Sequence, residues 1–117
     1  MSVRAIYKIR VPKTIHQQLY RLALRTDKSI NGLVVILLDS GIANERSTEL
    51  KDLSLRKGEP EMRPNPFSGR WVQSMPIPLH DRIFAAAKEE GVSINLLINT
   101  LLCRELGWLE RNLAIDR

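Results

Sequence analysis

The sequence predicts a mainly α-helical fold made of two copies of one strand–helix–helix unit. Three observations support this prediction. The 117-residue chain matches itself when it is shifted by 64 residues. Each copy opens on a short stretch in which apolar and polar side chains alternate, as they do on a half-buried strand. Each copy then continues with an amphipathic helix and a second, strongly apolar helix.

The internal repeat is the observation on which the others depend. It gives nine identities over about 37 aligned positions, and these fall on apolar helix positions and on turn residues. The identical pairs are Pro12 with Pro76, His16 with His80, Ala23 with Ala87, Ser29, Ile30 and Asn31 with Ser93, Ile94 and Asn95, Leu33 with Leu97, Leu37 with Leu101, and Leu38 with Leu102. Because two unrelated helices would rarely also share the proline and the Ser-Ile-Asn turn, we infer a true repeat.

The first element of each copy is predicted to be a strand. In residues 7–11 the apolar side chains occupy the odd positions, and the bases Lys8 and Arg10 occupy the even ones. Pro12 ends this stretch because proline has no amide hydrogen for the ladder of a sheet. Residues 71–76 have the same outline with a weaker alternation.

Two helices follow the strand in each copy. The first helix carries its apolar residues on one face, which are Ile15, Leu19, Leu22 and Ala23 in the first copy and Leu79, Ile83, Ala86 and Ala87 in the second. Ser29 and Ser93 are predicted to cap the second helix through their side-chain oxygens. Residues 30–38 are apolar around most of that helix, which must therefore be buried on several sides. One unit cannot provide such burial alone, so each needs a partner of its own kind.

Charge and composition divide the chain into three segments. Residues 1–43 carry the whole formal charge of +5, whereas residues 44–69 and residues 70–117 are each neutral. Residues 44–69 are rich in proline and glycine and are predicted to be a linker, with a possible short helix over residues 47–57. We therefore assign residues 1–43 to the first repeat and residues 70–117 to the second repeat with a C-terminal extension. A polyanion that binds the chain should therefore interact most strongly with residues 1–43.

Residue types exclude several classes of site. A single cysteine, Cys103, excludes an intramolecular disulfide and a cysteine-based zinc finger, and with His16 and His80 it does not make a metal set. We interpret the two histidines as helix-surface or boundary residues. Neither catalysis nor a cofactor is predicted, since His80-Asp81 near Ser74 lacks a nucleophile turn and an oxyanion device. No signal peptide or membrane span is readable, which predicts a cytoplasmic protein without a membrane partner.

The two copies together resemble the ribbon-helix-helix family of DNA-binding proteins, among them Arc repressor, the methionine repressor and HicB-type domains. The likeness lies in a short strand ending in an apolar–proline pair, a helix, a Ser-x-Asn turn and a buried second helix. Residues 68–76, 79–80 and 91–95 look most like the HicB-type version. With two such units over about 75 of the 117 residues, the chain also looks like the tandem members among conjugation accessory proteins of the TraY kind.

The resemblance implies a mainly α fold with a short two-stranded antiparallel β-ribbon, in which two units pair their strands and the ribbon enters the major groove of DNA. In a tandem chain the two repeats can pair within one chain as a pseudo-dimer. We favour this arrangement because the linker raises their effective concentration. Alternatively, each repeat pairs with its copy in another chain. The first arrangement predicts a non-palindromic DNA site and the second a palindromic one.

The same resemblance implies roles for the side chains of the ribbon, since alternate residues of a strand face the same way. Those expected to face the core are Tyr7, Ile9, Val11, Trp71, Gln73 and Met75. Those expected to read bases are Ile6, Lys8, Arg10, Arg70, Val72 and Ser74. The basic ones would donate to guanine, and Ile6 and Val72 would contact a thymine methyl. Ser74 stands where family members often carry an arginine. Those expected at DNA phosphates are Arg4, Lys28, Ser29, Asn31, Ser93 and Asn95, the last five from the starts of the second helices.

These observations predict a sequence-specific double-stranded DNA-binding protein that represses or regulates transcription, of the kind carried by phage or plasmids and able to associate with itself on DNA. Conjugation or origin accessory proteins are one alternative. Another is an antitoxin that neutralises a toxin partner and regulates its own synthesis, although only about ten residues follow the predicted last helix to form a toxin-binding tail. A third is a protein-interaction module that has lost DNA binding, which the poorly charged second strand would favour.

Overall fold

Helices dominate the computed structural model, which describes residues 4–43, 45–55, 67–112 and 114–115. Most of these residues are helical. In chain order the elements are β1 (Arg4–Arg10), α1 (Lys13–Arg25), α2 (Ile30–Ala43), α3 (Thr48–Lys51), β2 (Ser54–Leu55), β3 (Arg70–Pro76), α4 (Ile77–Glu90), α5 (Ile94–Asn112) and β4 (Ala114–Ile115). The predicted mainly helical fold with a two-stranded antiparallel sheet is confirmed.

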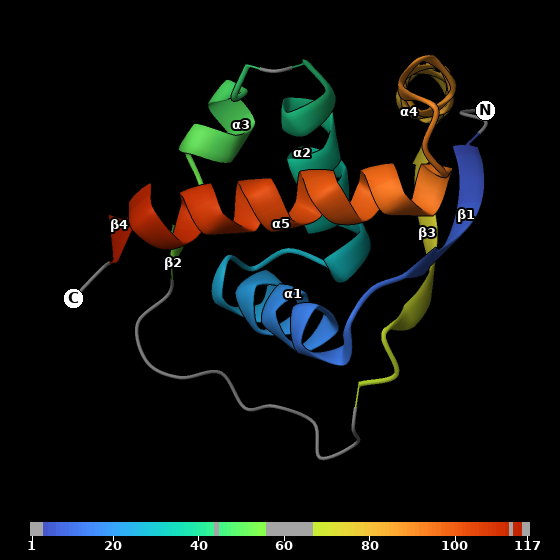
Figure 1. Cartoon of the computed structure of the whole chain (residues 1–117). Helices are drawn as coiled ribbons and strands as arrows, with labels where there is room; N and C mark the ends of the chain where they lie inside the picture. Colours follow the sequence, from blue (N-terminus) through green and yellow to red (C-terminus); the bar gives the residue numbers. More distant parts are fainter. Residues whose placement is uncertain (1–3, 44, 56–66, 113, 116–117) are drawn as a thin grey trace.

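The two-stranded sheet joins the starts of the two repeats. β1 and β3 pair antiparallel within the chain, with Arg4 opposite Pro76 and Arg10 opposite Arg70. This sheet, called the ribbon below, lies at one side of the molecule, far from the C-terminus (Figure 1). A helix follows closely after each strand, and Pro12 and Pro76 are the N-cap residues of α1 and α4, with φ of −55° and −59°.

The turn between the two helices of each repeat has the same conformation in both copies. Gly91 ends α4 with a φ of 69°, and Asp27, its equivalent in the first copy, has a φ of 59°. Both lie in the left-handed region, which glycine adopts at little cost and aspartate tolerates better than most residues. The predicted caps follow, since Ser29 Oγ accepts from Gly32 N at 2.9 Å and Ser93 Oγ accepts from Leu96 N at 3.0 Å.

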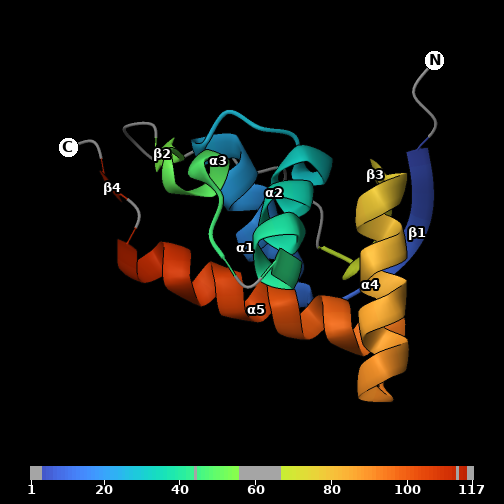
Figure 2. The ribbon, with the colours of Figure 1, turned by 90° about the horizontal axis from the view of Figure 1, so that it is seen from above.

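The two apolar helices bury each other. α2 packs against α5, α1 packs against α2, and α4 contacts both α2 and α5 and crosses one end of α5 (Figure 2). The leucines that are identical between the repeats all lie in the core, namely Leu33, Leu37, Leu38, Leu97, Leu101 and Leu102. This arrangement satisfies the expectation that each apolar helix needs a partner of its own kind. Burial of these side chains, at about 2 kcal/mol each, is a main source of stability.

The prediction of a helix over residues 47–57 is wrong in its length, because α3 covers only Thr48–Lys51. Ser47 caps it through a hydrogen bond from Leu50 N at 3.1 Å, but the helix ends at Lys51. The chain then turns so that Leu53 enters the core, and Ser54 and Leu55 form β2, which pairs with β4 in parallel. The proline-rich part of the predicted linker, residues 56–66, lies outside the described residues.

The C-terminal extension continues the last helix. α5 runs to Asn112, and Leu106 and Leu109 in its final turns are buried. In the described residues, no helix combines the length and the apolar character that crossing a bilayer requires.

Candidate nucleic-acid interface

The outer face of the ribbon exposes basic and apolar side chains together. The exposed residues are Arg4, Ile6, Lys8, Arg10, Arg70 and Val72, and Ser74 is half-buried. Ile6 is 67% exposed and Val72 is 54% exposed, although burial would be favourable for both. On the inner face Ile9, Gln73 and Met75 are buried, and Tyr7, Val11 and Trp71 pack against the core. The inward and outward alternation predicted from the sequence is therefore confirmed.

Two arginines meet at one end of this face. The register places Arg10 directly opposite Arg70 and Lys8 opposite Val72. Across the described residues, neither Lys8 nor either arginine forms an ion pair with an acid. These residues border a depression of about 730 Å³. Because like charges directly opposite each other destabilise a sheet, this end of the ribbon is suited to a negatively charged or electron-rich partner.

Ser74 binds a neighbouring side chain instead of pointing freely outward. Its Oγ accepts a hydrogen bond from Arg4 Nε at 2.7 Å, and its carbonyl oxygen accepts from Arg4 Nη2 at 3.4 Å. Ser74 therefore fixes the Arg4 guanidinium beside the ribbon. In the histidine–aspartate pair of α4, His80 Nδ1 lies 3.3 Å from Asp81 Oδ1.

Asn31 and Asn95 each bind the strand that belongs to the other repeat. Asn31, in the first turn of α2, accepts from Ser74 N at 2.7 Å and donates to the carbonyl of Val72 at 3.4 Å. Asn95, in the first turn of α5, accepts from Arg10 N and donates to Arg10 O, both at 3.0 Å. Each repeat thus grips the strand of the other. The phosphate role expected of these two amides stays a prediction, and the structure gives them a positioning role that the sequence did not indicate.

The helix N-termini lie at the two ends of the ribbon because these asparagines connect them to it. The side chains of Ser29 and Ser93 cap the helices, while first-turn N–H groups have no partner inside a helix and favour anions. Lys28 precedes the cap of α2 and is exposed, whereas Val92 occupies the equivalent position before α5. The two N-termini therefore differ in charge.

Two polar residues, Gln73 and Asn99, support the ribbon through contacts that were not predicted. Gln73 is fully buried, donates to Asn31 O at 2.9 Å and accepts from Trp71 Nε1 at 2.9 Å. Asn99 donates to Arg10 O at 2.7 Å. The repeat gave no signal for either residue, because their equivalents in the first copy, Ile9 and Val35, are apolar.

The interpretation of His16 as a surface or boundary residue is wrong. His16 is 5% exposed, its Nδ1 accepts from Gly69 N at 3.0 Å, and its ring lies 4.8 Å from that of Trp71. Phe67 closes over the other side at 5.1 Å. The segment before β3 thus covers this position in the first copy. His80, its equivalent, stays partly exposed at the boundary as expected.

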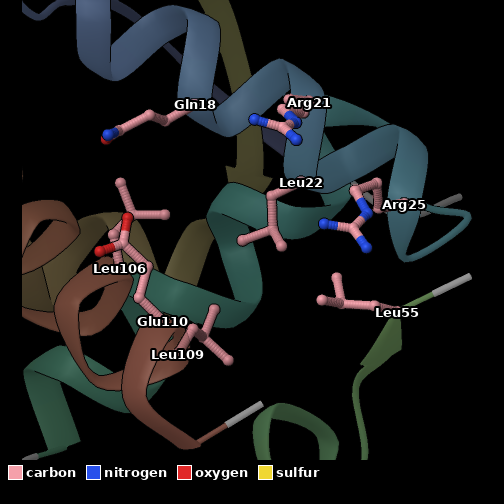
Figure 3. Close-up of a pocket in the computed structure, with 8 residues that line it drawn as sticks. All are labelled: Gln18, Arg21, Leu22, Arg25, Leu55, Leu106, Leu109 and Glu110. Atoms are coloured by element: carbon pink, nitrogen blue, oxygen red, sulfur yellow. The ribbon is translucent and has the colours of Figure 1, made fainter. Parts of the chain in front are cut away.

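A separate cavity of about 300 Å³ lies between α1 and α5. Figure 3 shows Arg21 and Arg25 of α1 on one side, Glu110 of α5 on the other, and leucines between them. The described residues lining it include no serine, threonine, cysteine or histidine, so they offer no hydroxyl, thiol or imidazole nucleophile. Among the described residues there is also no group of three or more histidine, cysteine or acidic side chains placed to hold a metal ion.

Comparisons of the chain with protein-family models, with curated proteins and with solved structures give no match.

Proposed function

We propose that this chain is a sequence-specific double-stranded DNA-binding protein that represses or regulates transcription. In this proposal it folds as a tandem ribbon-helix-helix pseudo-dimer, and the ribbon formed by β1 and β3 enters the major groove. The observation that carries the proposal is the outer face of the ribbon, where basic side chains that pair with no acid of the described residues stand beside exposed isoleucine and valine.

The dimensions and chemistry of the ribbon support this function. The major groove of B-DNA admits a two-stranded ribbon, and its base edges present guanine acceptors and thymine methyl groups. Lys8, Arg10 and Arg70 supply donors for the former, and Ile6 and Val72 supply apolar surface for the latter. The asparagine contacts fix the backbone of both strands relative to the helices, so the ribbon itself does not need to be ordered on binding.

The test replaces Lys8 and Arg10 by alanine in the full chain and measures the affinity for DNA duplexes selected from a random pool. We expect the double variant to fall to nonspecific affinity, because each good base contact contributes about 1–3 kcal/mol of discrimination. The matched control is the Lys51→Ala/Arg111→Ala variant, which removes the same charge from two exposed positions. These positions belong to α3 and to the C-terminal turn of α5, which lie away from the ribbon (Figure 1).

The salt dependence of binding distinguishes this function from its main alternative. Because DNA binding releases counterions, the affinity of the unmodified chain should fall steeply as salt rises. If the chain shows no salt-dependent affinity for duplex DNA, or if the control variant loses as much affinity as the ribbon variant, the proposal is wrong and a protein-interaction module is favoured.

A further inference from the structure

The register of the ribbon and the repeat in the sequence together locate a pseudo-twofold axis. Lys8 and Val72 are equivalent positions of the two repeats, and they also lie directly opposite each other. The axis therefore passes through this pair and divides the outer face into two ends. One end carries Arg10 and Arg70 and is called the arginine end below. The other carries Ile6 and Ser74 and, beyond them, Arg4, and is called the anchor end.

The two arginines of the arginine end come from different repeats, and they occupy positions that are not equivalent in the two repeats. The equivalent of Arg10 is Ser74, and the equivalent of Arg70 is Ile6. A symmetric dimer of the first repeat would place one arginine and one isoleucine at each end. The second repeat instead has an arginine at the position of Ile6 and an uncharged residue at the position of Arg10. Antiparallel pairing therefore brings both arginines to one end of the ribbon and both uncharged residues to the other.

The arginine end is built to contact bases. Its two exposed side chains repel each other, and no acid of the described residues neutralises them. An acceptor placed between them would relieve this repulsion. Guanine presents O6 and N7 to the major groove in a geometry that a guanidinium fits with two hydrogen bonds. The helix start at this end lacks a lysine, since Val92 precedes Ser93.

The anchor end has the opposite distribution of charge. Arg4 is held by Ser74, whose hydroxyl oxygen accepts a hydrogen bond from Arg4 Nε at 2.7 Å. Lys28 belongs to the same end, because Asn31, three residues later, binds the Ser74 amide. Facing the bases here is Ile6, which can offer only apolar contact. The cations of this end, Arg4 and Lys28, therefore lie beside the ribbon, and the outer-face residues Ile6 and Ser74 carry no charge.

We infer that the chain reads an asymmetric DNA site in which one half-site is specified by guanines under Arg10 and Arg70 together. The other half-site is held mainly through its phosphates by Arg4 and Lys28, with apolar contact to thymine at most. This inference depends on the proposed DNA-binding function. It differs from a reading in which each repeat specifies its own half-site, because it assigns residues of both repeats to the same base pairs.

The test selects duplexes from a random pool with the full chain and repeats the selection with Arg10→Ala and with Arg70→Ala. We expect both variants to lose guanine preference at the same base pairs of one half-site. Each should also bind the original site about 10- to 100-fold more weakly. Circular dichroism of each variant checks that the helices are retained, and Lys51→Ala is the control for loss of one charge.

Variants of the anchor end provide the complementary measurement. Arg4→Ala and Lys28→Ala should leave the selected sequence unchanged, weaken binding to all sequences alike and reduce the salt slope by about 1 each. The inference is overturned if the selected site is palindromic, or if Arg10→Ala and Arg70→Ala relax different half-sites. Either outcome leaves DNA binding itself intact, although a palindromic site would also contradict the pairing of the two repeats within one chain. If no sequence is enriched and no salt-dependent binding is seen, the proposed function fails as well.

Discussion

Gly69, which directly precedes β3, lies against the backbone of Val11 in the other repeat. Its φ is +80°, its carbonyl accepts from Val11 N at 2.7 Å, and its amide donates to His16. A Cβ atom built on it would lie 2.2 Å from Val11 O. Glycine is therefore required at this position for two reasons: the positive φ disfavours other residues, and there is no space for a Cβ atom.

Replacement of Gly69 by alanine is expected to lower the free energy of unfolding by more than about 2 kcal/mol. The positive φ alone costs about 1–2 kcal/mol, and the clash with the carbonyl of Val11 adds to it. Gly91→Ala is the matched control, because Gly91 has a φ of +69° but nothing within 4 Å of its Cβ position. Urea denaturation of both variants measures the difference, and equal losses would contradict the importance of the contact.

The alternation of residues along each strand was predictable from the sequence, whereas the partners of individual polar side chains were not. Period two decided which side chains of β1 face outward, since that property is local. The contacts of Asn31, Asn95 and Ser74 depend instead on the register between two strands far apart in the chain. No spacing within one repeat could have shown that each asparagine grips the other repeat.

At the scale of elements, the helices of the two repeats were predictable because each has its own apolar pattern and start signal. The segment between them was not, because β2 exists only through its pairing with β4, about 60 residues further along the chain. The same dependence on distant partners shortened the helix expected over residues 47–57.

One ion pair connects the segment that leaves α2 to the middle of α5. Glu105 has a side chain that is 3% exposed, and its oxygens lie 3.0 Å from Arg46 Nε and 3.6 Å from Arg104 Nε. Arg46 also lies over the ring of Trp108. Because a carboxylate without its partner is costly when buried, Arg46 should be important for keeping this segment against α5.

We expect Arg46→Ala to lower the free energy of unfolding by about 1–3 kcal/mol, less than for a fully buried pair because Arg46 is about one-third exposed. The double variant Arg46→Met/Glu105→Leu, which removes both charges and keeps apolar volume, should recover most of the loss. Chemical denaturation of the single and double variants checks this. A double variant less stable than Arg46→Ala would mean that the carboxylate has another essential role.

At the scale of the whole molecule, folding redistributes the charge that the sequence concentrates in one third of the chain. The excess of +5 lies in residues 1–43, which suggests a charged repeat and a neutral one. Antiparallel pairing of β1 with β3 instead places Arg10 beside Arg70 of the neutral repeat. The asymmetry of the folded protein therefore runs along the ribbon rather than from one repeat to the other, a property that requires the register and cannot be obtained from composition.

The pairing of the two repeats within one chain leads to a prediction about the molecule in solution. Its Cα radius of gyration is 14.1 Å, close to the roughly 13 Å typical of a single compact domain of this length. Since the ribbon and the α2–α5 core both form without a second chain, folding should be unimolecular.

The denaturation midpoint should therefore not change between about 1 and about 100 µM protein, because a unimolecular transition has no concentration term. Were the repeats paired between chains, a 100-fold dilution would lower the apparent stability by about 2.7 kcal/mol. Urea denaturation at both concentrations measures this, and sedimentation should give the 13.4 kDa of one chain. A midpoint that rises with concentration, together with twice that mass, would show that the repeats pair between two chains. Each repeat paired with its own copy would then place one arginine and one uncharged residue at each end of a symmetric ribbon, and the arginine end would not form.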